Sequence, residues 1–231
     1  MDPDETRRQW AERSGEFSPA YYAYYGSNEA SELVLAALDR YLDREARVLE
    51  LGCSSGRHLA HLHEHGFEDL AGIELNEDAL DVMASTYPDL AAEGTFYFAA
   101  MEDVVGDFED GSFDAVFSVQ TLQHVHPEAA WVFEEIARVT DDLLVTVENE
   151  GARGGGDRTQ GRTDGASRGS GAGDAPDSAG PAVNYVNDEF PLYYRDWGRV
   201  FTGLGLVEVE TGTDGRDTVR VFRSGTPASR V

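Results

Sequence analysis

The stretch Val48-Leu49-Glu50-Leu51-Gly52-Cys53-Ser54-Ser55-Gly56-Arg57-His58-Leu59 decides how this chain is interpreted. It begins with an apolar run typical of a buried β-strand, continues with a turn of small residues, and ends where helical periodicity begins. A strand that leads into a glycine-rich turn and a helix N-terminus brings backbone close to a nucleotide-like ligand in doubly wound α/β sheets. The sequence therefore predicts a ligand-binding turn at residues 52–56.

The segments around this turn alternate between strand patterns and helix patterns. Five short apolar runs predict strands, at residues 47–51, 70–75, 95–99, 113–119 and 143–147. Helical periodicity covers residues 28–41, 55–64, 77–86, 127–139 and, near the end, 196–204. Two alternating runs, at residues 206–210 and 218–222, predict a terminal hairpin. We therefore expect an α/β fold with a doubly wound, Rossmann-like sheet of seven mostly parallel strands that ends in an antiparallel pair.

The 231 residues fit one domain with four parts. Residues 1–45 would form a helical and aromatic N-terminal cap, and residues 46–150 the ligand-binding core. Residues 151–182 are rich in Gly, Ser, Asp and Arg and nearly lack large apolar side chains, so they bury too little surface to offset their ordering entropy. We predict a disordered insert there, followed at residues 183–231 by a substrate-side helix and the terminal hairpin.

The charge balance is strongly acidic. The formal net charge is −26, from 44 acidic residues against 18 basic ones, and every basic residue counted is arginine. This composition indicates adaptation to concentrated salt, where carboxylates keep a protein hydrated and salt screens their repulsion. Nucleic acid is a disfavoured partner, because phosphate contacts need clustered basic side chains, although halophilic nucleic-acid enzymes are acidic too.

The cysteine count and the apolar runs indicate the compartment. Cys53 is the one cysteine, which excludes an internal disulfide and a zinc cluster built from cysteines. Residues 1–5 lack the positive flank and apolar core of a signal peptide, and no apolar run reaches membrane-spanning length. We expect a cytoplasmic protein that does not enter the membrane.

Four motifs follow one another between the predicted strands. They are Glu50-Leu51-Gly52-Cys53-Ser54-Ser55-Gly56, then Gly72-Ile73-Glu74, then Met101-Glu102-Asp103, and finally the segment 110–118, which leads into Leu122-Gln123-His124-Val125. In this order they make residues 33–147 resemble the class I S-adenosylmethionine-dependent methyltransferases, in particular the small methyltransferase domains. The resemblance implies S-adenosylmethionine as cofactor and methyl transfer to an oxygen, nitrogen or carbon nucleophile of a small-molecule acceptor.

The resemblance also implies which residues meet the cofactor. Glu74 would hold the ribose diol, Met101 would pack on the adenine, and Gln120 would lie beneath the sulfonium. The complete implied set is Glu50, Gly52, Cys53, Ser54, Gly56, Arg57, Glu74, Leu75, Met101, Glu102 and Gln120. Two positions depart from the family pattern. Ser54 replaces a frequent glycine and is tolerable where its φ is not positive. Ala100 replaces a frequent acidic residue, so the contact with the adenine amino group is either lost or taken over by Glu102 or Asp103.

The acceptor side of the site rests on a histidine and on aromatic side chains. His124 or His126 would act as general base, since an unperturbed imidazole titrates near neutral pH; the competing interpretation is a polar helix start. Five aromatic residues are candidates for the acceptor pocket: Tyr21, Tyr25, Tyr193, Tyr194 and Trp197. We expect no metal, because His58, His61 and His65 share a helix face without a second set of ligands.

Two other functions share part of this pattern. An NAD-type Rossmann oxidoreductase would also place Glu74 on a ribose, but the turn lacks the third glycine of the pyrophosphate motif. A methyltransferase-like subunit that binds the cofactor without catalysis is the second alternative, and Ala100 favours it. The sequence specifies neither the acceptor nor the oligomeric state.

Overall fold

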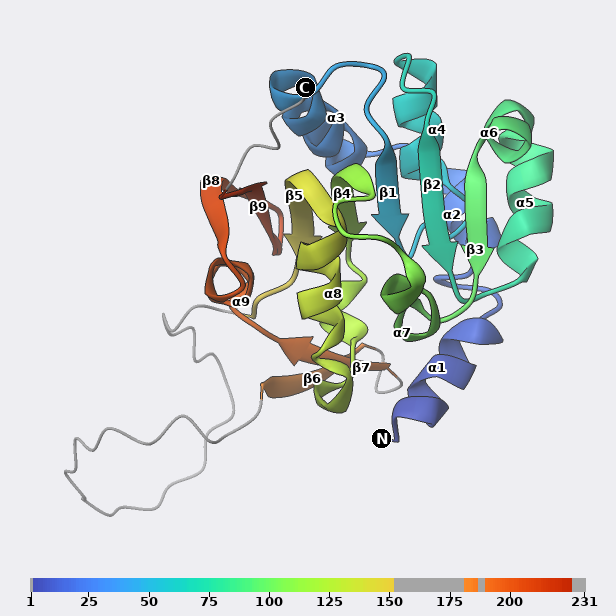
Figure 1. Ribbon diagram of the computed structural model, residues 1–231. Helices are drawn as coiled ribbons and strands as arrows, with labels where there is room; N and C mark the ends of the chain where they lie inside the picture. Colours follow the sequence, from blue (N-terminus) through green and yellow to red (C-terminus); the bar gives the residue numbers. More distant parts are fainter. Residues whose placement is uncertain (1, 152–180, 187–189, 226–231) are drawn as a thin grey trace, which may run out of the picture.

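A computed structural model describes residues 2–151, 181–186 and 190–225. Seven strands form one sheet in the order β3-β2-β1-β4-β5-β9-β8 (Figure 1). Their bounds are β1 Val48–Leu51, β2 Leu70–Glu74, β3 Thr95–Phe98, β4 Phe113–Val119, β5 Thr140–Glu148, β8 Leu206–Asp214 and β9 Asp217–Ser224. The first five are parallel, whereas β9 runs antiparallel to both β5 and β8. The predicted sheet, with its antiparallel end, is confirmed.

Helices cover both faces of this sheet. Their bounds are α1 Pro3–Ala11, α2 Pro19–Tyr25, α3 Glu29–Tyr41, α4 Arg57–Glu64, α5 Asp78–Thr86, α6 Pro88–Glu93, α7 Met101–Val104, α8 Val132–Val139 and α9 Trp197–Gly203. Val48 and Phe117 pack with α3 and α4, whereas Leu49 and Val116 pack with α8 and α9. The central strands therefore carry buried apolar side chains on both faces, as expected of parallel strands that helices cover on both sides. None of the helices in the described ranges is long and apolar enough to span a membrane.

Three local features differ from the expected pattern. Pro88 does not only stop α5 but begins α6, because proline is tolerated at the first position of a helix. The expected helix over residues 127–139 is divided into a 3-10 turn, Pro127–Ala129, and α8. Strand β5 begins three residues earlier than expected, and Thr140 pairs with Phe113 before the register shifts.

A second, two-stranded sheet follows the insert. It pairs β6 (Ala182–Val186) with β7 (Phe190–Tyr194), and Figure 1 places it beyond the carboxyl ends of β4 and β5. Of the insert predicted at residues 151–182, residues 152–180 lie outside the described residues, and Ala182 already belongs to β6. The aromatic residues that follow the insert are thus partly strand residues, which the sequence pattern did not predict.

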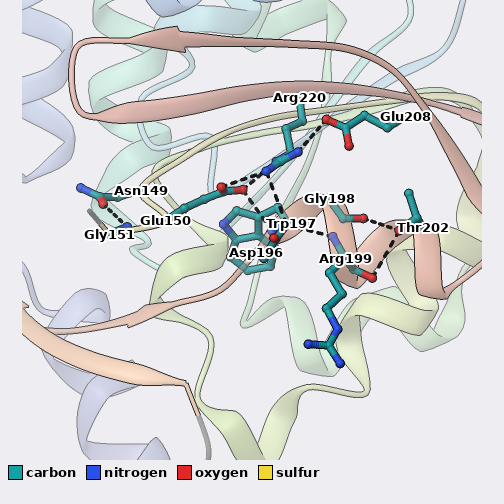
Figure 2. Close-up of polar contacts among 10 residues, drawn as sticks. All are labelled: Asn149, Glu150, Gly151, Asp196, Trp197, Gly198, Arg199, Thr202, Glu208 and Arg220. Atoms are coloured by element: carbon teal, nitrogen blue, oxygen red, sulfur yellow. Dashed lines mark hydrogen bonds and ion pairs between the residues drawn. The ribbon is translucent and has the colours of Figure 1, made fainter. Parts of the chain in front are cut away.

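A buried ion-pair network fixes the antiparallel end of the sheet (Figure 2). Arg220 on β9 is 4% exposed, and its Nε lies 2.7 Å from Oε1 of Glu150, just past β5. Its other guanidinium nitrogens bind Glu150 Oε2 at 3.0 Å and Glu208 Oε1, on β8, at 2.6 Å. The backbone N–H of Trp197, at the start of α9, donates to Glu150 Oε1 at 3.1 Å. Strands β5, β8 and β9 and helix α9 therefore meet at one guanidinium.

Candidate active site

A cavity of about 480 Å³ opens at the carboxyl ends of the parallel strands. It lies where β1 has β2 on one side and β4 on the other, the point in an open α/β sheet where the strand order reverses and ligands bind. The turn after β1, the end of β2, the start of α7 and the loop after β4 all contribute lining residues. The glycine-rich turn and Glu74 thus face one cavity, although they are far apart in sequence.

The N-terminal cap covers this cavity. Thr6, Arg7 and Trp10 of α1 line it, together with Tyr22 of α2. Asn76, just past β2, holds the cap in place because its Nδ2 donates to the backbone carbonyl of Arg13 at 3.0 Å. Figure 1 shows α1 at the edge of the sheet where β1 and β2 end. The cap therefore encloses a site that the sheet edge would otherwise leave open.

The turn after β1 depends on its glycines. Gly52 has φ +71°, and a Cβ on it would overlap the Thr121 side chain. Gly56, which does not line the cavity, has φ +80°, and a Cβ on it would lie 2.9 Å from Leu90 Cδ2. Ser54 has φ +49°, so the condition under which a serine was expected to be tolerable here is not met. Its N–H donates to Glu74 Oε2 at 2.8 Å, and this bond to a buried carboxylate offsets the backbone strain.

Glu74 at the end of β2 is held by backbone donors on both oxygens. Oε1 accepts from the N–H of Asn76 at 2.7 Å, and Oε2 accepts from the N–H of Ser54. Burial raises the pKa of this carboxyl, and the backbone donors partly offset that rise. The backbone N–H groups of Ser54, Asn76 and Leu75 favour its charged form, and a carboxylate with about four lone-pair sites keeps acceptor capacity for a ligand hydroxyl.

The remaining cofactor candidates divide into lining and supporting residues. Cys53, Leu75, Met101 and Glu102 line the cavity. The Glu102 carboxylate also lies 3.5 Å from Nε of Arg7, which brings a cation from α1 to this end of the site.

Two predicted residues lie beside the turn rather than at its centre. Arg57 lines the cavity, and its guanidinium carbon is 4.7 Å from the ring centroid of Tyr22. Glu50 is 1% exposed and does not line the cavity, and burial raises its pKa well above the ordinary value. Within the described ranges its Oε2 has no hydrogen-bond partner. Glu50 therefore supports the strand below the turn and has no access to a ligand.

The loop after β4 carries the residues expected near the reacting atoms. Gln120 has φ +54°, an uncommon conformation for a residue other than glycine, and lines the cavity. Its Nε2 donates to Oδ2 of Asp217, at the start of β9, at 2.5 Å. The loop is therefore tied to the C-terminal hairpin, a connection that the sequence did not indicate.

His124 lines the same cavity in a defined protonation state. Its Nδ1 lies 3.1 Å from the carbonyl oxygen of Pro191 on β7, and because a carbonyl only accepts, Nδ1 carries the proton and Nε2 is an acceptor. Burial lowers the pKa of His124 to about 4, so the expectation of a pKa near neutrality is wrong. The Trp10 ring packs 4.8 Å from the imidazole. His126 does not line the cavity and packs on Tyr193.

A residue that the sequence analysis missed positions this loop. Glu148 ends β5 and is fully buried, and its carboxylate accepts from the Ser118 hydroxyl at 2.5 Å. The N–H groups of Thr121 and Leu122 donate to the same oxygen at 3.0 Å each, and that of Gln123 donates to the other oxygen at 3.2 Å. Burial raises the pKa of Glu148 to about 7, partly offset by these donors. An acidic residue directly after the predicted strand at residues 143–147 was the available signal.

Most of the aromatic residues predicted for the acceptor pocket do not line the cavity. Of the five candidates, all within the described residues, Tyr194 lines the cavity and Tyr21, Tyr25, Tyr193 and Trp197 do not. Trp197 is completely buried against Phe133, because α9 packs its aromatic face on the sheet. The cavity takes its apolar surface instead from the cap and the β6–β7 hairpin, through Trp10, Phe17, Tyr22, Tyr185 and Leu192.

The histidines of α4 are engaged in other contacts. His58 Nδ1 lies 2.7 Å from the Ser31 hydroxyl, and its Nε2 accepts from Arg57 at 3.2 Å. His65 Nδ1 donates to the carbonyl of His61 at 2.7 Å. Among the residues that the structure describes, no three His, Cys, Asp or Glu side chains are arranged to hold a metal ion.

Comparison with known proteins finds a family of domains that matches the core of the chain. Residues 48–142 match the methyltransferase domain family. The match begins at β1 and runs through the glycine-rich turn, Glu74 and the loop after β4, and ends within β5. The methyltransferase domain expected from the motifs is confirmed.

Solved structures share the fold at low identity. The 1,6-didemethyltoxoflavin-N1-methyltransferase of Burkholderia thailandensis, solved with 1,6-didemethyltoxoflavin and S-adenosylhomocysteine, is 15% identical with a TM-score of 0.62, over 86% of this chain and 79% of that one. The magnesium protoporphyrin IX methyltransferase of Synechocystis PCC 6803, solved with S-adenosylmethionine, is 15% identical with a TM-score of 0.58, over 96% and 90%. The [4+2]-cyclase SpnF is 14% identical with a TM-score of 0.60, over 93% and 85%. At these identities the likeness establishes the fold.

Proposed function

We propose that this protein, which carries a methyltransferase domain on the class I fold, transfers a methyl group from S-adenosylmethionine to a small molecule bound beneath its N-terminal cap. One observation carries the proposal. The turn of residues 52–56 and the Glu74 carboxylate face one cavity and are joined by the 2.8 Å bond from Ser54 N–H to Glu74. A backbone cradle beside a carboxylate suits a ligand that presents both a nucleoside diol and an amino-acid end.

The residues present fit this cofactor. Gly52 lets the turn adopt φ +71° and leaves space for the Thr121 side chain against its backbone, so the turn and the loop after β4 meet at the cavity. Glu74 would hold the ribose hydroxyls on its free lone pairs, and Leu75 and Met101 would pack on the adenine. Arg57, the first residue of α4, would meet the carboxylate of the methionine part. When bound, the cofactor supplies an electrophilic methyl group on a sulfonium.

His124 would orient the acceptor. Its Nε2 accepts a hydrogen bond from the nucleophilic O–H or N–H, because Nδ1 is committed to Pro191. With a pKa of about 4 the imidazole is neutral at pH 7, so it aligns the nucleophile and stores no proton. Glu148 and Gln120 fix the loop that carries it. Alignment of nucleophile, carbon and sulfur within a closed pocket supplies much of the rate in such displacements.

The neighbours support a small acceptor and also keep one alternative open. Two of them are named for toxoflavin-precursor and magnesium porphyrin substrates, which are small molecules. The third is named as a [4+2]-cyclase on the same fold, so the fold alone does not fix the reaction. Cofactor binding without methyl transfer is therefore the second candidate, and Ala100 in the cavity wall agrees with it.

Two measurements on the purified protein test the proposal. Calorimetric titration with S-adenosylmethionine, S-adenosylhomocysteine and NAD, at low and at multimolar potassium chloride, decides the cofactor. Incubation with methyl-labelled S-adenosylmethionine and separated small-molecule and macromolecular cell fractions then identifies the acceptor class. We expect both adenosyl compounds to bind and label to enter the small-molecule fraction. Binding of NAD alone refutes the proposal, and adenosyl binding without label transfer to any fraction supports the second candidate.

A further inference from the structure

The charge balance of the cavity differs from that of the chain. Across the whole sequence 44 acidic residues face 18 arginines. Among the described residues that line the cavity, the balance is reversed, with Arg7, Arg13, Arg57 and Arg216 against Glu74, Glu102 and Asp217. A cation-rich cavity in a chain this acidic concentrates anions at that one place.

Most of these arginines already have a role. Arg7 faces Glu102 at 3.5 Å, and Arg57 lies at the cofactor turn. Arg13 donates from Nε to the carbonyl of Glu16 at 2.6 Å and stacks on Phe190, with 4.8 Å from its guanidinium carbon to the ring centroid. These three therefore serve the cap and the cofactor end of the cavity.

Arg216 differs from the other three. It lies exposed in the turn between β8 and β9, and within the described part of the chain no hydrogen bond or ion pair holds its guanidinium. Its neighbour Asp217 accepts a hydrogen bond from Gln120, and Arg216 acts on that carboxylate through its charge alone. Strand β9 is four strand spacings from β2, roughly 19 Å at the usual interstrand distance, so Arg216 faces the end of the cavity opposite Glu74.

Two further side chains at this end present donors, because their acceptor atoms are already used. The Tyr194 hydroxyl oxygen accepts from Nδ2 of Asn184 at 2.9 Å, which leaves its O–H proton to donate. Asn149 Oδ1 accepts from the N–H of Gly151 at 2.8 Å, as Figure 2 shows, which leaves the Asn149 amide N–H groups to donate. Both side chains line the cavity. A guanidinium, a hydroxyl proton and an amide therefore meet at one end.

We propose that the acceptor is an aromatic molecule that carries a carboxylate. The inference rests on the proposed function. The carboxylate pairs with Arg216 and accepts from Tyr194 and Asn149, since guanidinium and neutral donors together match its oxygens. The ring lies between the Trp10 and Leu192 side chains of the cavity wall. Its O–H or N–H nucleophile points to His124 Nε2.

A matched pair of probes tests the carboxylate. In protein saturated with S-adenosylhomocysteine, calorimetry compares 2-hydroxybenzoate with 2-hydroxybenzamide, which share ring and hydroxyl and differ in charge. We expect the carboxylate to bind about tenfold more tightly. Arg216→Gln should bring the ratio close to one and Tyr194→Phe should reduce it, both with unchanged affinity for S-adenosylhomocysteine. Arg40→Gln, which removes the same charge from the outer face of α3, should keep the wild-type ratio.

The outcomes separate the two proposals. Equal affinity for the two probes, no binding of either, or a preference that survives Arg216→Gln overturns the carboxylate inference while S-adenosylhomocysteine still binds. Absence of S-adenosylhomocysteine binding overturns the proposed function and this inference with it.

Discussion

Glu74 offers the sharpest test of the cofactor site. Its buried carboxylate accepts from the N–H groups of Ser54 and Asn76 at 2.8 and 2.7 Å, and its remaining lone pairs face the cavity. Glu74→Ala removes the acceptor for the ribose hydroxyls, and a buried polar group that is left without its partner costs about 1–3 kcal/mol. We therefore expect a loss of about 1–3 kcal/mol, roughly 5- to 150-fold in the Kd of S-adenosylhomocysteine.

A cycle of variant and ligand separates this contact from damage to the turn. Calorimetry compares S-adenosylhomocysteine with the analogue that lacks both ribose hydroxyls, on the wild type and on Glu74→Ala. The wild type should prefer the natural ligand by the factor above, and Glu74→Ala should bind the two equally, however much its turn is disturbed. Glu102→Ala, which removes another cavity carboxylate, should keep the wild-type preference. A Glu74→Ala protein that still discriminates the hydroxyls as the wild type does would refute the assigned role.

Three further predictions concern buried charge and are read from unfolding free energies in urea at fixed salt. Arg220→Met removes the cation that pairs with the buried Glu150 carboxylate and should lose about 3–5 kcal/mol. Arg223→Met, whose side chain is 36% exposed, should lose at most about 1 kcal/mol, and equal losses would contradict the network. Burial depresses the pKa of His124 to about 4, so between pH 4 and 6.5 the folded state binds fewer protons than the unfolded state. As pH falls through that range, the wild type should lose about 3 kcal/mol of unfolding free energy relative to His124→Asn. Unfolding free energies that change with pH in parallel for the two proteins would exclude the depressed pKa. Burial raises the pKa of Glu148 to about 7, so between pH 4.5 and 7 the folded state binds more protons than the unfolded state. As pH rises through that range, the wild type should lose about 3 kcal/mol of unfolding free energy relative to Glu148→Gln. A difference in unfolding free energy that stays constant with pH would show that the carboxyl is unperturbed.

The apolar pattern predicted the sheet because its strands are buried on both faces. Strand β4 begins and ends at the predicted residues, Phe113 and Val119. Its side chains are apolar except Asp114, whose carboxylate accepts from the Arg47 N–H, and Ser118, whose hydroxyl binds Glu148. Helix α1 and the β6–β7 hairpin were not predicted as elements. Nine residues of mixed polarity are marginal as an isolated helix, and α1 is held by contacts such as that of Trp10 with Phe190, which is 180 residues away in the sequence.

The sequence predicted the parts of the site that are formed by local backbone. It did not predict the parts that depend on side chains from distant segments. A glycine-rich turn and an acidic strand end are local signals, so the cradle around Gly52 and Glu74 follows from the sequence. The protonation state of His124 depends on the Pro191 carbonyl and on burial by Trp10, neither of which is near it in sequence. Trp197 was predicted to line the acceptor pocket because that segment is rich in aromatic residues, but its side chain is buried in the core between α9 and the sheet.

Three consecutive residues at the end of β5 explain how the two ends of the cavity are held independently. Glu148 binds the loop after β4, and Glu150 binds Arg220 (Figure 2), so buried carboxylates on either side fix the position of Asn149 between them. The proposed acceptor end therefore lies beside β5 and β9, whereas the proposed cofactor end lies beside β1 and β2. Substitutions on the β8–β9 turn, such as those of Arg216, can then change the acceptor without moving the Ser54–Glu74 bond. Relatives of this fold that are named for unrelated acceptors are the expected consequence of that separation.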